Sequence, residues 1–408
     1  MQCGLLGRKL SHSYSPQIHA SLGDYRYNLY EVEPEDLESF LTKSDFDGLN
    51  VTIPYKKAVI DYCDELSPRA KQLGAVNTLV RKNGKLIGHN TDYFGFQSMI
   101  EKCGISVTGK KALVLGSGGA SATAVAVLTE MGARVVTVSR SGPDNYQNLD
   151  RHSDAAIIVN ATPVGMYPET EESILSLDKF DSLSCVLDLI YNPANTQLLQ
   201  QAQRRNIPCE NGLWMLVAQA KESSEWFTGK HIPYQVIQRI HHCICFEMEN
   251  IILIGMPGCG KTTVGSLLAQ KLNRPFMDAD RIIEEKAGIS IPEIFATQGE
   301  PGFRSLETQV LSEICKISGA VISTGGGCVT RPENYPLLHQ NGKIIWLQRN
   351  IRNLAVDGRP LSQVNTMEDM YMHRRPLYQK FSDCSVDNNT DPMSTVQEIL
   401  RYFEKEKT

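Results

Sequence analysis

Residues 251–262 read Ile251-Ile252-Leu253-Ile254-Gly255-Met256-Pro257-Gly258-Cys259-Gly260-Lys261-Thr262, an apolar strand that leads into a glycine turn. The turn has the spacing Gly-x4-Gly-Lys-Thr, in which backbone N–H groups curl around phosphate oxygens without obstruction by Cβ atoms. Lys261 would neutralise the β- and γ-phosphates, and the Thr262 hydroxyl would hold Mg²⁺. A helix rich in Leu and Ala follows, so its N-terminus faces the same phosphates. The pattern predicts a P-loop that binds a nucleoside triphosphate.

A second glycine turn, Gly116-Ser117-Gly118-Gly119-Ala120, follows another apolar strand earlier in the chain. Its Gly-x-Gly spacing is typical of a dinucleotide fold, although Ser121 stands at the third small position. The next strand ends at Ser139-Arg140-Ser141, where an NAD site places a carboxylate. An arginine there suits the 2′-phosphate of NADP, which a carboxylate would repel. The sequence therefore favours NADP, and the alternative is that Arg140 is an ordinary surface residue.

The composition excludes several classes of protein. A net charge of -5 gives no long-range attraction for nucleic acid or for an anionic membrane. No apolar run approaches the roughly 18 to 20 residues of a membrane span, and the first residues, MQCGLLGRKL, do not have the pattern of a signal peptide. The 11 scattered cysteines are typical of free thiols in a reducing compartment. We expect a cytoplasmic protein whose partners are small molecules, with no nucleic acid and no membrane.

Apolar strands that alternate with helical segments predict an α/β fold with parallel, doubly wound sheets. A chain of 408 residues is expected to form two or three domains. Asn83-Gly84 adds a hairpin signal between two of the strands. The expected domains are an α/β substrate domain over 1–103 completed by helices of about 213–240, a Rossmann-type NADP domain over 104–240, a linker over 241–249, and a P-loop domain over 250–408 with a parallel, five-stranded sheet flanked by helices.

Charged and glycine-rich motifs follow the P-loop in a fixed order. They are Asp278-Ala279-Asp280, Phe303-Arg304 with Glu307, Gly325-Gly326-Gly327, Gly358-Arg359-Pro360-Leu361 and Arg374-Arg375-Pro376-Leu377-Tyr378. Over residues 248–404 and across all these motifs, the chain closely resembles the shikimate kinases. The resemblance implies that Asp278 supports Mg²⁺ with Thr262, and that Asp280 contacts the acceptor hydroxyl as a catalytic partner of Lys261.

The same resemblance implies how acceptor and nucleotide are bound. Arg304 and Arg374 would clamp a substrate carboxylate, which suits planar guanidinium groups that cannot lose their charge. Taken alone, Arg304 and Glu307 could instead be a solvated i,i+3 helix pair. Gly326 and Gly327 would let the substrate approach the backbone, and Arg359 would reach the phosphates from a mobile lid. The implied ATP-binding residues are Gly258, Cys259, Gly260, Lys261, Thr262, Thr263 and Arg359.

A further ordered set of motifs fills the first 240 residues. It comprises Ser13-Tyr14-Ser15-Pro16, Asn50-Val51-Thr52-Ile53-Pro54-Tyr55-Lys56, Gly74-Ala75-Val76-Asn77-Thr78, Asn90-Thr91-Asp92, Asn160-Ala161-Thr162-Pro163-Val164-Gly165-Met166, Tyr191-Asn192-Pro193 and Asn211-Gly212-Leu213 with Gln219. This order resembles the shikimate dehydrogenases. The resemblance implies that Lys56 and Asp92 form the catalytic pair. The alternatives are a surface lysine and a helix-capping aspartate.

The dehydrogenase resemblance also assigns binding residues. Tyr55 stands where histidine is frequent in that family and Ser139 where asparagine is common, and the second departure is expected to affect cofactor affinity. Substrate binding is implied for Ser13, Ser15, Thr52, Asn77, Asp92, Tyr191 and Gln219. Cofactor binding is implied for Gly116, Gly118, Gly119, Ala120, Ser139, Arg140, Thr162 and Gly212.

The two halves point to one metabolite. The first would reduce 3-dehydroshikimate to shikimate with NADPH, and the second would phosphorylate shikimate to shikimate 3-phosphate with ATP and Mg²⁺. These are consecutive steps toward chorismate and the aromatic amino acids. The alternatives are a first half that uses quinate or NAD, a kinase for another polyol, and a catalytically silent binding protein. The reactive groups Lys56, Asp92, Lys261 and Asp280 are all present, which argues against the last.

Overall fold

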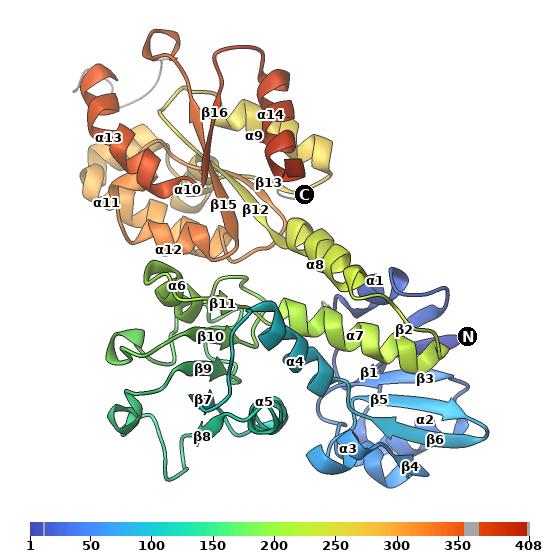
Figure 1. The fold of residues 1–408 in the computed structure, drawn as a ribbon. Coiled ribbons are helices and arrows are strands. Elements are labelled where there is room, and N and C mark those ends of the chain that lie inside the picture. The colour runs from blue at the N-terminus through green and yellow to red at the C-terminus, as the bar shows by residue number, and fades with distance from the viewer. Residues whose placement is uncertain (11–12, 355–366, 406–408) are drawn as a thin grey trace. The chain divides into compact units, whose positions relative to one another are not determined.

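The computed structural model describes residues 1–10, 13–354 and 367–405. Its contacts divide the chain into two compact units (Figure 1). Unit 1 comprises residues 1–165, 172–191 and 198–243, and unit 2 comprises residues 166–171, 192–197 and 244–408. Helix α8 (Gln235–Met248) covers most of the segment predicted as a linker.

The first sheet of unit 1 has the strand order β2-β1-β3-β5-β6-β4. The predicted hairpin is confirmed, because Asn83 and Gly84 adopt positive φ angles of 53° and 75° between two antiparallel strands. The expectation of parallel pairing is wrong for this sheet, since β5 is antiparallel to β6 through the hairpin and also antiparallel to β3 on its other side. The strands are β1 (Gln2–Gly7), β2 (Arg26–Glu31), β3 (Gly48–Val51), β4 (Glu65–Leu66), β5 (Thr78–Lys82) and β6 (Lys85–His89).

Helices α4 (Asp92–Lys102) and α7 (Leu213–Thr228) pack closely against each other. Gly95 makes this approach possible, because a Cβ atom there would lie 2.7 Å from the Met215 carbonyl oxygen. Phe227 of α7 packs on Cys3 and Val80 of the first sheet. Helix α7 therefore packs on the sheet formed by the first 90 residues. The other helices here are α1 (Ser15–Ala20), η1 (Pro34–Asp36), α2 (Leu37–Lys43), η2 (Ala58–Tyr62) and α3 (Pro68–Leu73).

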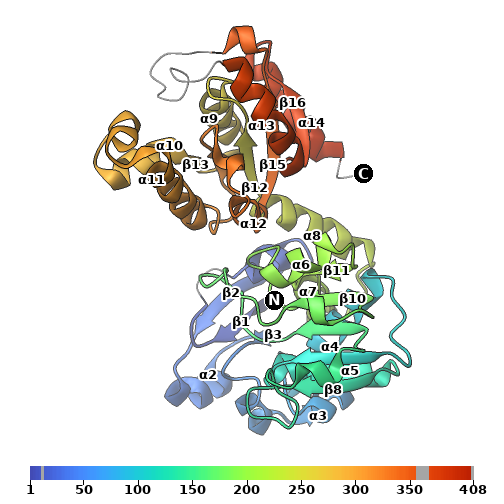
Figure 2. The ribbon, with the colours of Figure 1, turned by 90° about the vertical axis from the view of Figure 1, so that its left-hand side faces the viewer.

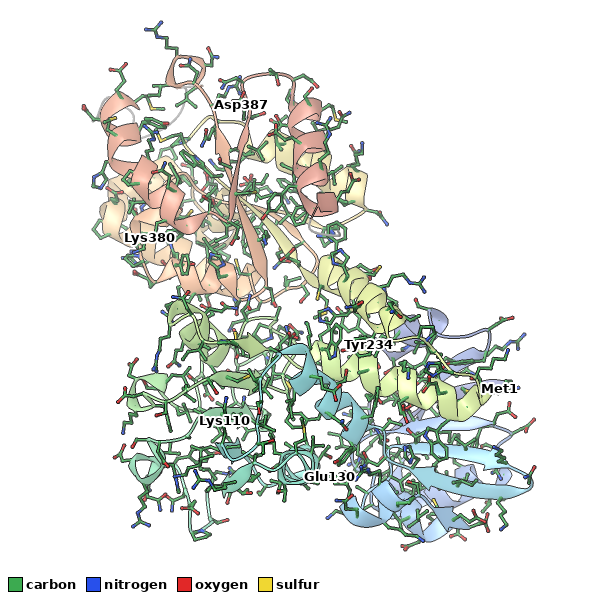
Figure 3. The ribbon with its side chains drawn as sticks, viewed as in Figure 1. Met1, Lys110, Glu130, Tyr234, Lys380 and Asp387 are labelled. Atoms are coloured by element: carbon green, nitrogen blue, oxygen red, sulfur yellow. The ribbon has the colours of Figure 1, made fainter. Side chains whose placement is uncertain are left out.

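The second sheet of unit 1 is parallel throughout, with the order β11-β10-β9-β7-β8. Strand β7 lies between β8 and β9, so the strand order reverses at β7, and ligands of such sheets bind at the carboxyl end of that position. Arg69 of α3 bonds to Glu130 at the end of α5 at 2.5 and 2.7 Å (Glu130 is labelled in Figure 3). The elements are β7 (Lys111–Leu115), α5 (Gly119–Glu130), β8 (Arg134–Val138), η3 (Leu149–His152), β9 (Ile157–Asn160), η4 (Leu177–Lys179), β10 (Cys185–Asp188), α6 (Gln197–Arg204) and β11 (Cys209–Glu210).

Unit 2 contains a five-stranded parallel sheet of order β13-β14-β12-β15-β16, as predicted for the P-loop half. Strand β12 is central and fully buried because every residue of Ile251–Ile254 is apolar. Helices α9 and α14 lie on one face, and α11, α12 and α13 lie on the other (Figure 1). The strands are β12 (Asn250–Ile254), β13 (Phe276–Asp278), β14 (Val321–Ser323), β15 (Gly342–Gln348) and β16 (Cys384–Asp387).

Helices α10 and α11 lie beside β13 (Figure 2). Gly299, with φ 68°, interrupts α11 and separates it into two helical segments. Among the described residues, no helix is both long and apolar enough to cross a membrane. The helices of unit 2 are α9 (Lys261–Leu272), α10 (Ala279–Ala287), α11 (Ile291–Ile314), η5 (Cys328–Thr330), α12 (Asn334–His339), η6 (Ile351–Asn353), α13 (Met367–Phe381) and α14 (Pro392–Lys405).

Candidate active sites

Lys56 and Asp92 form an ion pair in unit 1, with Nζ 2.7 Å from Oδ2. The two side chains are 30% and 17% exposed, so a ligand can reach both groups. Asp92 is the first residue of α4, where the helix N-terminus favours a carboxylate. The Lys56 carbonyl accepts a hydrogen bond from the Val76 N–H at 2.7 Å, which fixes the lysine backbone against the next motif. The structure thus places an ammonium group and a carboxylate in contact, as the sequence predicts.

A buried hydrogen-bond network surrounds this pair. Asn77 receives a hydrogen bond from the Thr91 N–H at 2.7 Å and donates to the Thr91 hydroxyl at 3.0 Å. The Thr91 hydroxyl also lies 3.3 Å from Gln219 Oε1 and 3.0 Å from the Ser223 hydroxyl. Because Thr91 directly precedes Asp92, the network connects two predicted substrate-binding residues, Asn77 and Gln219, to the start of α4.

Sequence reasoning missed Ser223. Its hydroxyl accepts from Asn50 Nδ2 at 2.7 Å, lies 3.0 Å from the Thr78 hydroxyl and donates to the Gln219 carbonyl at 2.9 Å. The available signal was its spacing, since a residue four positions after Gln219 lies on the same helix face. Ser223 therefore joins α7 to strands of the first sheet beneath the predicted substrate site.

A second group of predicted substrate-binding residues gathers around α1. The Ser15 N–H donates to the Ser13 hydroxyl at 3.2 Å. Tyr14, between them, packs edge-on against Tyr191 with ring centroids 6.3 Å apart, and burial raises the pKa of Tyr191. Burial raises the pKa of Tyr27 and the Ser15 side chain opposes this rise, while the Tyr27 hydroxyl donates to Asn50 Oδ1 at 2.8 Å. Through Asn50 this group connects to the network around Ser223.

Two residues of the Asn50–Lys56 motif have structural contacts. Thr52 is half-buried, and its N–H donates to the Leu6 carbonyl at 2.9 Å. Tyr55, the departure from histidine, is buried in the core of the first sheet, and its hydroxyl donates to the Val32 carbonyl. The Tyr55 side chain is therefore a core residue in this protein, while Lys56 next to it is accessible.

The glycine turn of the second sheet has the shape that a dinucleotide requires. Gly116 has φ 116°, and its carbonyl accepts from the Ser121 hydroxyl at 2.7 Å. Ser121, at the third small position, thus stabilises the turn through a hydrogen bond to its first glycine. A Cβ atom on Gly118 or Gly119 would meet no atom within 4 Å, so the room beside the turn is open on the side of the helix N-terminus. Ala120 is the second residue of α5.

Other predicted cofactor residues lie at the ends of neighbouring strands. Arg140 is exposed just after β8, and the Ser139 N–H donates to the Asp144 carbonyl at 3.1 Å. Thr162 lies against the glycine turn, and its hydroxyl donates to Asn160 Oδ1 at 2.7 Å. Gly212 precedes α7, where a Cβ atom would lie 2.1 Å from the Leu189 carbonyl oxygen. Close backbone packing therefore already requires glycine at 212.

The P-loop of unit 2 has left-handed glycines at Gly258 (φ 79°) and Gly260 (φ 97°). Lys261 begins α9 and folds back over the loop, with Nζ 2.9 Å from the Gly255 carbonyl oxygen. The Cys259 side chain is buried, and its carbonyl accepts from Asn388 at 2.6 Å. Thr262 and Thr263, the next two residues of the helix, are exposed.

Oxygen donors suitable for Mg²⁺ lie beside the P-loop. The Thr262 hydroxyl donates to Asp278 Oδ2 at 2.7 Å, so the two predicted metal-binding residues are in contact. Mg²⁺ in kinases is bound by one or two protein groups together with phosphate oxygens and water. A hydroxyl and a carboxylate at this separation fit that donor set.

Arg304, which is predicted to bind the acceptor carboxylate, forms an ion pair with a glutamate. Arg304 is 5% exposed, and its Nη1 donates to Glu307 Oε2 at 2.8 Å. Glu307 is fully buried, so the solvated helix pair that the sequence allowed is wrong. A Cβ atom on Gly327 would lie 2.0 Å from Arg304 Nη2, which explains the glycine. Arg374, also buried, donates to the Gly326 carbonyl at 3.2 Å.

Two buried carboxylate oxygens converge in the same place. Asp280 Oδ1 and Glu307 Oε1 have no hydrogen-bond partner among the described residues. A Cβ atom on Gly325 would lie 2.8 Å from the first and 2.3 Å from the second. Burial raises the pKa of Asp280 to about 6, Lys261 opposes this rise, and Glu307 adds to it. A hydroxyl-bearing ligand would provide the donor that these oxygens lack. Arg359, predicted to reach the phosphates, lies outside the described residues.

Sequence profiles and curated relatives identify the two units. The profile "Shikimate dehydrogenase substrate binding domain" matches residues 5–79, "Shikimate 5'-dehydrogenase C-terminal domain" matches 212–240, and "Shikimate kinase" matches 257–404. Shikimate dehydrogenase (NADP(+)) of Clostridium perfringens strain 13 is 34% identical over 261 residues, which cover 58% of this chain and 96% of that protein. The enzyme of the same name from Clostridium beijerinckii is 36% identical, with 60% and 98% covered.

Solved structures agree for the N-terminal part. Shikimate dehydrogenase 1 from Peptoclostridium difficile is 36% identical with a TM-score of 0.54, and the match covers 60% of this chain and 97% of that one. Shikimate 5-dehydrogenase from Thermus thermophilus, in complex with NADP(H) and shikimate, is 30% identical with a TM-score of 0.55, and 60% and 99% are covered.

Fold and sites together define the class: a dinucleotide-dependent oxidoreductase joined in one chain to a P-loop kinase. The chain belongs to the shikimate dehydrogenase family, and it carries a shikimate kinase domain at its C-terminal side. It is a bifunctional enzyme of the shikimate pathway.

Proposed function

We propose that unit 1 reduces 3-dehydroshikimate to shikimate with NADPH, and that unit 2 transfers a phosphoryl group from ATP to the 3-hydroxyl of that product. The contact between Lys56 and Asp92 supports the first reaction. The buried, partnerless oxygens of Asp280 and Glu307 beside two buried arginines support the second. This second constellation carries the proposal, because it suits an acceptor that has both a hydroxyl and a carboxylate.

In the reduction, NADPH held beside the glycine turn and Arg140 would supply the hydride for the carbonyl carbon. Lys56 then donates a proton from Nζ to the oxygen that becomes negatively charged. Asp92 accepts a hydrogen bond from the same ammonium group, which holds Nζ in place. Asn77 and Gln219, fixed through Thr91, would orient the substrate ring.

In the phosphoryl transfer, Arg304 and Arg374 would hold the acceptor carboxylate, and Asp280 would orient the attacking hydroxyl and accept its proton. Lys261 would neutralise charge on the β- and γ-phosphates. Thr262 and Asp278 would hold Mg²⁺, which supplies further charge neutralisation at the phosphates. The reaction depends mainly on positioning and electrostatics, which these residues provide.

The identity of the reductase substrate is tested by kinetics with shikimate or quinate and with NADP or NAD. A quinate dehydrogenase from Corynebacterium glutamicum in complex with NAD is 26% identical with a TM-score of 0.56, so quinate with NAD is the alternative pair. We expect kcat/KM to be highest for shikimate with NADP. A clear preference for quinate or for NAD would overturn this part of the proposal.

Cofactor choice is predicted to depend on Arg140. Arg140→Asp should lower kcat/KM for NADPH by about 10-fold or more while it affects NADH little, because a carboxylate repels the 2′-phosphate. Arg151→Asp, at another exposed arginine of unit 1, should leave the ratio of kcat/KM for NADPH to kcat/KM for NADH unchanged. Unaltered selectivity in Arg140→Asp would show that the 2′-phosphate is recognised elsewhere.

Phosphorylation is predicted to depend on the ionisation of Asp280. The pKa of Asp280 is raised to about 6 chiefly by burial, so the carboxylate that accepts a proton is lost as pH falls through this value. The kinase kcat/KM for shikimate should therefore be constant above about pH 7 and fall tenfold per pH unit below about 6. A profile that stays flat down to pH 5 would contradict a catalytic role for this carboxylate.

A further inference from the structure

Arg349 directly follows β15 in unit 2, and the backbone on both sides of it is fixed. The Asn388 N–H donates to the Gln348 carbonyl at 2.7 Å, and the Asn350 N–H donates to Asn389 Oδ1 at 2.7 Å. Asn388 and Asn389 directly follow Asp387, which is the last residue of β16 (labelled in Figure 3). The arginine is therefore held where the carboxyl ends of β15 and β16 meet.

The guanidinium group of Arg349 lies beside the P-loop. A Cβ atom on Gly260 would lie 3.6 Å from Arg349 Nη1 and 2.6 Å from Asn388 Nδ2. Asn388 in turn donates to the Cys259 carbonyl at 2.6 Å, which ties the same corner to the loop. Because Gly260 immediately precedes Lys261, two cationic side chains flank the first turn of α9.

Among the residues that the structure describes, no carboxylate forms an ion pair with Arg349. The Nε atom of Arg349 is buried and has no hydrogen-bond partner among the described residues. The ion pairs of arginines described for this unit involve Arg281, Arg304 and Arg331, and none includes Arg349. The nearby helix N-terminus carries partial positive charge of its own. A buried donor that is unpaired in such surroundings is satisfied best by an anionic ligand.

We propose that Arg349 is a nucleotide-binding residue of the kinase site, where its guanidinium binds the phosphate groups of ATP beside Lys261. The planar donors of arginine match phosphate oxygens in geometry as well as in charge. This assignment rests on the proposed ATP-dependent function of unit 2. It adds a fixed arginine, held by β15 and β16, to the predicted phosphate contact of Arg359.

The test uses the full chain with Arg349→Met and Arg349→Lys, and Mg²⁺ with ATP or ADP as the probe. Titration calorimetry should show that Arg349→Met weakens ATP binding by about 10-fold or more, as expected when a charge-assisted hydrogen bond is lost. Arg349→Lys should recover part of the affinity, because lysine keeps the positive charge but lacks the planar set of donors of the guanidinium group. KM for shikimate at saturating ATP and the rate of reduction should not change.

A matched control and a stability measurement separate ligand binding from a structural role. Arg401→Met, at an exposed arginine on α14, should bind ATP as the wild type does. Without nucleotide, Arg349→Met should unfold at the same or a higher temperature, because it removes an unpaired charge. ATP affinity within twofold of wild type would overturn the proposal, and so would a loss of affinity with a matching loss of stability that Arg349→Lys does not restore. A wild-type protein that binds no ATP would refute both this role and the kinase function.

Discussion

Replacing Lys56 with methionine is expected to lower the rate of 3-dehydroshikimate reduction by a factor of about 10² or more. The ammonium group lies 2.7 Å from Asp92 and is the proposed proton donor, whereas methionine keeps most of the apolar side chain without a proton to donate. The loss should appear in kcat and in kcat/KM, with a smaller effect on KM. Steady-state oxidation of NADPH at 340 nm measures it, and phosphorylation by the same preparation should continue.

The neighbouring lysine supplies the control for this experiment. Lys57 is exposed and follows Lys56 directly, so Lys57→Met changes the same charge one position away. It should retain reduction within about twofold, as is usual for substitutions at the surface. If Lys56→Met kept wild-type kcat, or if Lys57→Met lost as much as Lys56→Met, the assignment of the proton donor would be wrong.

Lys261→Met is expected to lower phosphorylation by about 10³-fold while reduction continues. The Lys261 ammonium group folds over the P-loop and bonds to the carbonyl oxygens of Gly255 and Met256 at 2.9 and 3.1 Å. It is therefore already positioned where phosphate charge would develop. The rate of formation of shikimate 3-phosphate, followed through ADP release, measures the effect.

Lys271 offers a matched change on the same helix. It is exposed in the last turn of α9, far along the helix from the phosphate loop, and Lys271→Met should leave both activities intact. Residual kinase activity above about a tenth of wild type in Lys261→Met would contradict the proposed charge neutralisation. A parallel loss of reduction would show instead that the substitution disturbs the whole chain.

The two glycine turns could be predicted from sequence because their backbone shape depends on local residue types. Left-handed φ angles at Gly258 and Gly260 and the closed turn at Gly116 need glycine wherever the rest of the chain lies. The proximity of Thr262 and Asp278 likewise followed from the kinase motifs, since Thr262 lies in the first turn of α9, just after β12, and Asp278 ends β13 at the same edge of the parallel sheet. Such features can be predicted because they depend on residue types within a short segment of the chain.

Features that depend on contacts between residues far apart in the sequence were not predicted. Ser223 bonds to Thr91 and Asn50, which precede it by 132 and 173 residues, and nothing in its own segment indicates those partners. Glu307 belongs to a segment that also fits an exposed helix, and its burial becomes evident only when Gly325 packs against it. The position of β16, one of the five strands predicted for the P-loop half, was not located from the sequence, because Val386 is its only buried residue.

Arg349 shows the same limitation at a functional position. Arg349 is held beside the P-loop because β15 and β16 pair in parallel, although about 40 residues separate the two strands in the sequence. The antiparallel pairing of β5 in the first sheet also needed the fold, since the hairpin turn indicates the reversal without indicating which strand β5 joins on its other side. Sequence motifs therefore located the chemistry, and tertiary pairing determined the residues that support it.

The most direct test supplies the full chain with 3-dehydroshikimate, NADPH, ATP and Mg²⁺ and identifies the product by mass spectrometry. We predict shikimate 3-phosphate as the final product, with shikimate alone when ATP is omitted and no product when NADPH is omitted. A chain that forms neither shikimate nor its phosphate ester under these conditions would contradict the account.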